Sequence, residues 1–270
     1  MYLCIFIIFF VICILWSFLE STLFKVNKID ISSNKLKGNL KIVFISDIHF
    51  GNYYTKDRLQ NIVIKVNSLK ADLIIIGGDY IDNSKRSKFN RKTLNKLFDD
   101  LGNLKAKIGV YSVLGNHDYY LGKYTHNLIY EMKKSGINLL INSTIKIKLE
   151  DETILLSGID DLEMGTVNLN RLLYSENNLN LMISHNPDFY EEYKSYYDIG
   201  LAGHIHGGQV TFFGLYAPIT ESRYGQKYVR TINKVKGQKS MVITTKGLGC
   251  SKLPIRFFAF PEIIEININR

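Results

Sequence analysis

The sequence predicts an α/β fold for one large domain, preceded by a single apolar helix. Three observations carry this prediction. The chain has 270 residues, of which 46% are hydrophobic and 22% charged, with only 4 Pro, a composition that excludes a disordered or collagen-like chain. Apolar runs of strand length alternate with segments of helical periodicity between residues 40 and 270. The first 19 residues carry no charged side chain.

The N-terminal segment, residues 1–19, has the length and composition of a transmembrane helix. It shows no polar face at helical spacing, which a soluble core helix would have. A cleaved signal peptide is the alternative, but the segment has no basic start and no small-residue cleavage site before Glu20. We therefore predict an uncleaved anchor over residues 1–20, a linker over 21–39 and the main domain over 40–270.

The distribution of basic residues bears on orientation and partners. Lysines follow the predicted anchor at positions 25, 28, 35 and 37, and nothing basic precedes it. Since basic flanks favour the cytoplasmic side, the main domain of a single-pass membrane protein is predicted to be cytoplasmic, with the opposite orientation as the alternative. The net charge is +9, but no basic run interleaved with aromatic residues is present, so neither a nucleic-acid nor a protein partner is predicted.

Eight apolar runs are predicted to be strands of the main domain. They are residues 41–46, 73–76, 109–114, 155–157, 179–184, 199–202, 241–245 and 262–268. The segments 56–69, 91–101 and 124–135 place apolar residues three or four apart, which predicts amphipathic helices. No linker rich in Gly, Ser or Pro and no internal repeat interrupts the domain.

Polar residues gather directly after five of these predicted strands. The five stretches are SDIHFG (46–51), GGDYID (77–82), GNHD (115–118), SHNPD (184–188) and GHIHGG (203–208). Because ligands of open α/β sheets bind outside the carboxyl ends of the strands, we expect these clusters to converge on one site. They contain five of the 6 His, and the sixth, His126, lies in a predicted helix where a surface or capping role is expected.

The clusters supply oxygen and nitrogen ligands without a thiolate, namely Asp47, His49, Asp79, Asn116, His185, His204 and His206. Such a set favours Mn, Fe or Zn over calcium or a cysteine-rich structural zinc. Seven ligands suit two metals bridged by a carboxylate better than one metal with open positions. Asp47 and His49 are expected to face the same ion, because residues i and i+2 of an extended backbone point the same way. The 3 Cys form no recognisable disulfide, zinc or nucleophile pattern.

Each cluster taken alone has an ordinary explanation. Asp-x-His is common by chance, Asn-His-Asp can form a turn, and a buried histidine is more often hydrogen-bonded in a core than bound to a metal. The conjunction favours a site, because the ordinary explanation would have to hold separately at five strand ends.

The ordered set DIH, GDYID, GNHD, SHNPD and GHIH resembles the signature of the calcineurin-like metallophosphoesterase superfamily. The resemblance spans residues 47–206 and implies a four-layer sandwich, in which two mixed β-sheets are flanked by helices, with a catalytic site that hydrolyses phosphoesters. It implies two divalent metal ions, with Mn favoured over Fe or Zn.

The resemblance also implies a role for each site residue. One metal would be held by Asp47, His49 and His206 and the other by Asn116, His185 and His204, with Asp79 bridging both. His117 would act as the general acid or stabilise charge on the phosphoryl group, and Asp82 would orient the ring of His117 through a hydrogen bond.

Departures from the family pattern narrow the expected substrate. Asp82 is followed by Asn83 and Ser84 where the Ser/Thr protein phosphatase branch has Arg, which argues against a protein substrate. The stretches GHIHGGQ, SRYGQKYV (222–229) and GLGCSKLPIRFFAFPEI (247–263) resemble the bacterial membrane-associated branch, some members of which cleave the pyrophosphate of UDP-diacylglucosamine. We therefore expect a phosphorylated small molecule or a lipid-linked or envelope substrate.

Two questions stay open at this point: which basic residues hold a phosphate group, and whether the chain has a function other than phosphoester hydrolysis of small molecules. Arg223, Lys227, Arg230 and Arg256 are candidates to hold a phosphate group, and ordinary surface charge is the alternative for each. A DNA nuclease of the same superfamily and a non-catalytic metal-binding scaffold are the competing functions. A scaffold would be expected to have lost His117 or several ligands, and this chain retains them all.

Overall fold

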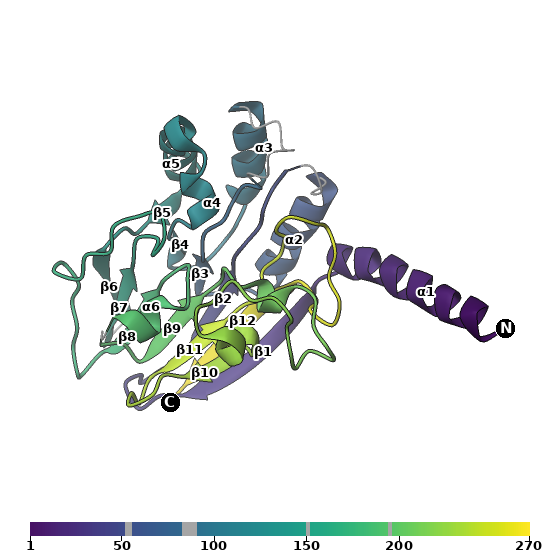
Figure 1. The fold of residues 1–270 in the computed structure, drawn as a ribbon. Coiled ribbons are helices and arrows are strands. Elements are labelled where there is room, and N and C mark those ends of the chain that lie inside the picture. The colour runs from purple at the N-terminus through teal and green to yellow at the C-terminus, as the bar shows by residue number, and fades with distance from the viewer. Residues whose placement is uncertain (52–55, 83–90, 150–151, 194–195) are drawn as a thin grey trace.

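The computed structural model describes residues 1–51, 56–82, 91–149, 152–193 and 196–270. Two six-stranded β-sheets pack against each other in the body, helices cover the outer face of the first sheet, and one long helix projects away from the body (Figure 1). Each sheet contains both parallel and antiparallel pairs, as predicted for the α/β sandwich of two mixed sheets.

The first sheet has the strand order β1-β12-β2-β3-β4-β5. Its strands are β1 (Lys25–Ser32), β12 (Glu262–Asn269), β2 (Leu40–Ile45), β3 (Leu73–Ile76), β4 (Gly109–Ser112) and β5 (Ile137–Leu139). All neighbouring pairs are parallel except β12 with β2. The carboxyl ends of β2, β3 and β4 therefore lie side by side at one end of the sheet.

The second sheet has the order β10-β11-β9-β8-β7-β6. Its strands are β10 (Ile232–Lys234), β11 (Met241–Thr244), β9 (Ile199–Ala202), β8 (Leu179–Ile183), β7 (Glu152–Gly158) and β6 (Ser143–Leu149). The four inner strands are parallel, and the outer pairs β10 with β11 and β6 with β7 are antiparallel. The carboxyl ends of β8 and β9 therefore also point in one direction.

Three apolar clusters hold the layers together. The cluster between the sheets joins residues such as Phe44 and Ile75 of the first sheet to Leu156 and Leu201 of the second. Another packs the first sheet against α2 (Lys56–Ser68), α3 (Arg91–Leu101) and α5 (Thr125–Lys134). The third covers the outer face of the second sheet through the short helix α6 (Phe189–Glu192) and the turn η3 (Gly225–Val229). The remaining short helices are α4 (Asn116–Tyr119), η1 (Gly122–Tyr124) and η2 (His206–Gly208).

The segment predicted as a linker, residues 21–39, differs from that expectation. Residues 25–32 form β1, which pairs with β12 along its whole length, from Lys25 opposite Glu262 to Ser32 opposite Asn269. The apolar side chain of Ile29 is buried between the sheets, whereas its neighbours Lys28 and Asp30 are charged and exposed. The sequence KVNKIDIS contains no continuous apolar run, which explains why it was not predicted to be a strand.

Helix α1 (Tyr2–Thr22) is almost entirely exposed along its apolar length. Among the described residues it is the one helix long and apolar enough to cross a membrane. Its last turn is fixed to the body through Glu20, which is fully buried. The Glu20 carboxylate accepts hydrogen bonds from the backbone N–H groups of Phe258 at 3.1 Å and Ala259 at 2.7 Å, and from the Trp16 indole at 2.9 Å.

We expect Glu20→Ala to loosen the junction between α1 and the body. The change leaves the backbone N–H groups of Phe258 and Ala259 without their acceptor, and the free energy of unfolding should fall by about 1–3 kcal/mol. Denaturant unfolding of the full chain in detergent micelles measures this. Thr22→Ala, which removes an exposed hydroxyl bonded only to Leu19 of the same helix, is the control. An unchanged unfolding free energy in Glu20→Ala would show that the contact is not stabilising.

Candidate metal centre

The predicted ligands lie at the ends of five strands. Asp47 and His49 follow β2, Asp79 follows β3, Asn116 opens α4 after β4, His185 follows β8, and His204 and His206 follow β9. All seven side chains are buried. Since three of the strands belong to the first sheet and two to the second, the site lies where the carboxyl ends of both sheets meet.

Asp47, His49 and His206 form one compact group whose ligand atoms lie within 4.8 Å of one another. Nε2 of His206 is 3.7 Å from Oδ1 of Asp47, and Nε2 of His49 faces Nε2 of His206 at 3.1 Å. This is the trio that the sequence assigned to one metal ion. The structure brings all three together.

Asp79 lies between this group and His185. Its Oδ2 atom is 3.4 Å from Nε2 of His49 and 3.3 Å from Nε2 of His185. Asp47, Asp79 and His185 form a second group with ligand atoms within 4.8 Å. A carboxylate oxygen in contact with one histidine from each half of the site has the position that a bridging ligand needs.

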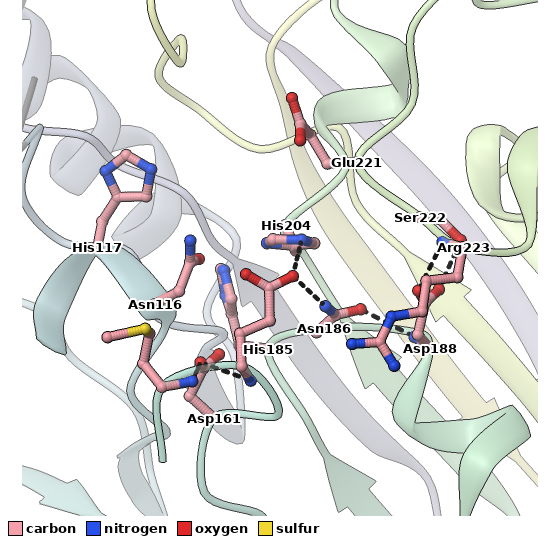
Figure 2. Close-up of polar contacts among 12 residues, drawn as sticks. Asn116, His117, Asp161, His185, Asn186, Asp188, His204, Glu221, Ser222 and Arg223 are labelled. Atoms are coloured by element: carbon pink, nitrogen blue, oxygen red, sulfur yellow. Dashed lines mark hydrogen bonds and ion pairs between the residues drawn. The ribbon is translucent and has the colours of Figure 1, made fainter. Parts of the chain in front are cut away.

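Asn116 and His204 are the two predicted ligands outside these groups. The rings of His185 and His204 lie 5.2 Å apart, and Asn116, His185 and His204 project toward the same region (Figure 2). Nε2 of His204 is 3.5 Å from Oε1 of Glu163, an acid that the sequence analysis did not single out. Glu163 also accepts a hydrogen bond from Asn186 at 3.3 Å.

Buried polar atoms without a hydrogen-bond partner test whether metals fit this site. Four of the seven predicted ligands carry such an atom: Asp47 Oδ2, Asn116 Oδ1, His185 Nε2 and His204 Nε2. Nδ1 of His49 also has no partner, but it is Nε2 of that ring that faces His206 and Asp79. Leaving a buried polar atom without a partner is costly, so such atoms gathered in one place indicate a missing partner. Cations satisfy oxygen and imidazole nitrogen lone pairs at once, and the donor set fits divalent metal ions.

A hydrogen bond sets the orientation of His185. Nδ1 of its ring lies 2.7 Å from the carbonyl oxygen of Gly77, which can only accept, so Nδ1 carries the proton. The lone pair of the neutral ring is then on Nε2, which faces Asp79 and has no hydrogen-bond partner. Supporting contacts of this kind are usual for metal-binding histidines.

The backbone at the site is strained at five ligand positions. The φ angles of Asp47, His49, Asp79, His204 and His206 lie between 46° and 70°, in the left-handed region that few residues other than glycine adopt. The expectation that Asp47 and His49 share an extended backbone is therefore wrong, although their side chains do converge. Strained backbone of this kind is concentrated at functional sites, where the surrounding structure enforces it.

Two glycines allow the loops to approach the ligands closely. A Cβ atom on Gly203 would lie 2.3 Å from Oδ2 of Asp47, and one on Gly115 would lie 2.2 Å from Oδ1 of Asp79. No larger residue fits at either position without moving a ligand. Ile205, between His204 and His206, is buried in the cluster outside the second sheet, so its side chain points away from the site.

His117 lies beside the metal ligands and is partly exposed. Its ring packs edge to face on that of His49 with centroids 4.7 Å apart, and its backbone N–H donates to Oδ1 of Asp79 at 2.9 Å. Nδ1 of His117 is buried and accepts or donates no hydrogen bond, so the predicted bond from Asp82 does not involve this atom. Asp82 is buried, with its Cβ 3.0 Å from the position of a Cβ on Gly51. Asn83 and Ser84 lie outside the described residues.

Burial and charge set the protonation of the site. Burial lowers the pKa of His49 to about 3 and lowers the pKa of His206 well below its usual value, so both rings are neutral and able to bind metal. Burial also lowers the pKa of His185, but the charges of Asp79 and Asp47 outweigh it and raise that pKa well above its usual value. Burial, followed by the charge of Asp79, raises the pKa of Asp118 to about 7. Without a metal His185 is therefore protonated beside Asp79, and a cation bound there would take the place of that proton.

Asp118 and Arg256 are functional residues whose importance the sequence analysis missed. Oδ1 of Asp118 accepts from the N–H of Tyr80 at 2.9 Å, and Oδ2 accepts from Asp79 at 3.0 Å and Gly115 at 2.9 Å. This one carboxylate fixes the loops after β3 and β4 together. The sequence does contain a pointer to Asp118, because it is the last residue of the GNHD stretch, 115–118.

Arg256 is not a surface charge or a ligand for an exposed phosphate, because it is completely buried. Its guanidinium group donates to the carbonyl oxygens of Ala259 at 2.8 Å, Lys246 at 2.7 Å and Gly249, and lies 3.3 Å from Nδ1 of His206. It supports the loop that carries His206.

The other basic candidates pair with acidic residues or are exposed. Arg223 pairs with Glu192, Lys227 pairs with Glu191, and Arg230 is exposed. His126, on α5, is exposed as expected.

Asp118→Asn should weaken both folding and metal binding. Whichever way the new amide is turned, its NH2 group faces at least one of the three backbone N–H donors, so the free energy of unfolding should fall by about 1–3 kcal/mol. The displaced Asp79 should lower the metal content, measured by plasma mass spectrometry. Asp99→Asn, an exposed acid on α3, controls for the loss of one charge. Unchanged metal content in Asp118→Asn would contradict the positioning role.

Comparison with known proteins agrees with this geometry. Residues 40–208, more than half of the chain, match the model of the family described as calcineurin-like phosphoesterase. An uncharacterized metallophosphoesterase of Bacillus subtilis, YkuE, is 32% identical over 231 residues, covering 83% of this chain and 77% of that protein.

Two further relatives are similar over most of the chain. An uncharacterized metallophosphoesterase of Aquifex aeolicus is 28% identical over 263 residues, covering 94% of this chain and 95% of that protein. A Danio rerio protein named as a transmembrane protein with metallophosphoesterase domain is 30% identical, covering 90% of this chain and 56% of that protein. With the buried Asp and His groups at the strand ends, these similarities show that the chain belongs to the calcineurin-like phosphoesterase family and is a metal-dependent phosphoester hydrolase.

Proposed function

We propose that the chain binds two divalent metal ions through the seven predicted ligands. Asp47, His49 and His206 hold one ion, and Asn116, His185 and His204 hold the other, with Asp79 bridging them. The observation that carries this proposal is the set of buried polar atoms without hydrogen-bond partners on four of these side chains, those of Asp47, Asn116, His185 and His204. The position of Asp79 Oδ2, within 3.4 Å of both His49 and His185, supports the bridging role.

Manganese is the metal we favour, with iron or zinc as the alternatives. The set contains three oxygen ligands from carboxylate and amide groups and four imidazoles. These groups are harder Lewis bases than the thiolates of the cysteine-rich sites that select zinc. Two divalent ions supply a hydroxide nucleophile near neutral pH and neutralise charge on the phosphate.

His117 is proposed to serve the leaving group. During hydrolysis a new bond forms between a water-derived oxygen and phosphorus, and the bond from phosphorus to the leaving oxygen breaks. The imidazole of His117 donates a proton to that oxygen, because it is partly exposed beside the ligands and a positioned imidazole can act as a general acid. Asp82, which is buried, is proposed to orient the His117 ring.

The substrate is proposed to be membrane-associated. Helix α1 has the length and hydropathy of a membrane span and leaves its apolar surface exposed. The Danio rerio relative is named a transmembrane protein. We infer that α1 anchors the chain in the cell membrane with its body on the cytoplasmic side, and that the substrate is a lipid-linked or envelope phosphoester or pyrophosphate, of which UDP-diacylglucosamine is one example.

Removal of metal should abolish hydrolysis, and Mn should restore it. The full chain, stripped with a chelator and reloaded with Mn, is assayed against phosphomonoesters, bis-p-nitrophenyl phosphate, nucleotide-sugar pyrophosphates, phospholipids and single-stranded DNA. We expect cleavage of at least one phosphoester or pyrophosphate only in the reloaded protein. Cleavage of DNA in preference to the small substrates would favour a nuclease, and hydrolysis of none of them would contradict the proposal.

His117→Ala should separate proton donation from metal binding. We expect kcat to fall by about 10²-fold to 10⁴-fold, because a positioned general acid contributes that much, while the metal content stays at the wild-type level. Steady-state kinetics and metal analysis of the same preparation measure both quantities. His126→Ala on the exposed face of α5 is the matched control. Loss of metal from His117→Ala would make His117 a ligand rather than an acid.

A further inference from the structure

The segment directly after His206 has an unusual surface. Residues 207–220, GGQVTFFGLYAPIT, contain no charged side chain. Six large apolar residues in this segment are exposed, and five of them are more than half exposed: Phe212, Phe213, Leu215, Tyr216 and Ile219. Phe213 is 76% and Ile219 72% exposed, which leaves both side chains almost wholly in contact with solvent. A cluster of this size normally marks an interaction site. We call these five residues together with Phe258 the apolar loop surface.

The apolar loop surface is held in a defined conformation. The N–H of Thr211 donates to the carbonyl oxygen of Phe257 at 2.9 Å, and the N–H of Phe212 donates to the carbonyl oxygen of Tyr216 at 2.8 Å. The amide of Gln209 donates to the carbonyl oxygens of Ser251 and Leu253 at 3.2 Å and 3.1 Å. These bonds expose the apolar side chains on a fixed loop rather than burying them.

The apolar loop surface is continuous with the end of α1. The ring of Phe213 contacts that of Phe258 with centroids 5.3 Å apart, and the backbone N–H of Phe258 binds the Glu20 carboxylate at the last turn of α1. In Figure 1 α1 leaves the body at this end of the molecule. The surface therefore begins at the level where α1 emerges from the body.

The residues at that level have the chemistry of a membrane interface. Trp16, in the last turns of α1, packs its ring edge to face on Phe260 with centroids 6.3 Å apart. Nζ of Lys25 lies 3.4 Å above the same Phe260 ring. Tryptophan and basic residues gather where a membrane span meets the headgroups. Exposed apolar side chains at the same height would enter the boundary between headgroups and acyl chains.

We propose that the apolar loop surface inserts into the lipid bilayer that α1 spans and forms a second membrane contact of the body. The proposal rests on the proposed anchoring role of α1 and is independent of the phosphoester chemistry. A second protein is the less favoured occupant, because the surface is joined through Phe258 to the last turn of the exposed apolar helix α1 and contains no charged side chain.

The second contact would hold the metal centre at the membrane surface. His206 is followed directly by the loop, and Gly208 is packed so closely that a Cβ atom there would lie 2.1 Å from Cβ of Ala217 within the loop. The last ligand of the site and the membrane contact are therefore one continuous structure. A substrate with acyl chains could reach the site while its chains remain in the bilayer.

Photo-cross-linking of the full chain in phosphatidylglycerol and phosphatidylethanolamine vesicles tests the proposal. Benzoylphenylalanine replaces one residue at a time: Phe213 in the surface, Phe9 in α1, and Tyr196, which is 74% exposed and precedes the amino end of β9, as the matched control. Lipid and protein adducts are counted by mass spectrometry. Far-ultraviolet circular dichroism checks that each variant is folded.

We expect lipid adducts at position 213 to be comparable with those at position 9 and at least about tenfold above those at position 196, as for a side chain buried in the interface. Adducts at 9 but only background at 213 would overturn the second contact and leave the anchor intact. Background at both positions would overturn the anchor and with it this proposal. Cross-links from 213 to a second copy of the chain instead of lipid would also overturn it.

Discussion

The burial of several carboxylates next to four histidines is the constraint on which the rest of the structure depends. Asp47, Asp79 and Asp118 are almost completely shielded from water and lie in one region where the two sheets meet. Burial raises the pKa values of Asp47 and Asp118, which shows that their negative charge is unfavourable there without a counter-charge. Nearby histidines supply part of it, and bound cations would supply the rest. The strained ligand backbones and the closely packed glycines are consequences of bringing these groups together.

The sheets bring the ligands to one place because their parallel strands end together. All eight predicted strands were confirmed, and they are the eight interior strands of the two sheets. The four strands that were missed, β1, β5, β6 and β10, are the four edges. An interior strand is buried on both faces and forms a continuous apolar run, whereas an edge strand such as KVNKIDIS alternates with polar residues or is very short. Periodicity therefore identified the part of the fold that carries the site.

The candidate site was predictable in its residues but not in its geometry. Polar clusters at strand ends were enough to select the seven candidate ligands, since the carboxyl ends of parallel strands meet, whereas the role of His117 came from the family resemblance alone. The left-handed backbone of Asp47 and His49 could not be predicted, because it is imposed by contacts between loops, such as the bond from the His204 N–H to Oδ1 of Asp47 at 2.9 Å. Arg256 was misjudged for a similar reason: only the folded chain shows that it binds three backbone carbonyls around His206.

Arg256 and the loop that carries it link the metal site to the proposed membrane anchor α1. The N–H of Arg256 donates to the carbonyl oxygen of Ser17 at 2.9 Å, while its side chain supports His206.

Electron paramagnetic resonance of the Mn-loaded full chain tests the central claim, a pair of metal ions bridged by Asp79, most directly. The account predicts two Mn ions per chain with an exchange-coupled spectrum, which Asp79→Asn converts to that of isolated ions or abolishes. One ion per chain, or a coupled spectrum that survives Asp79→Asn, would contradict the bridged pair.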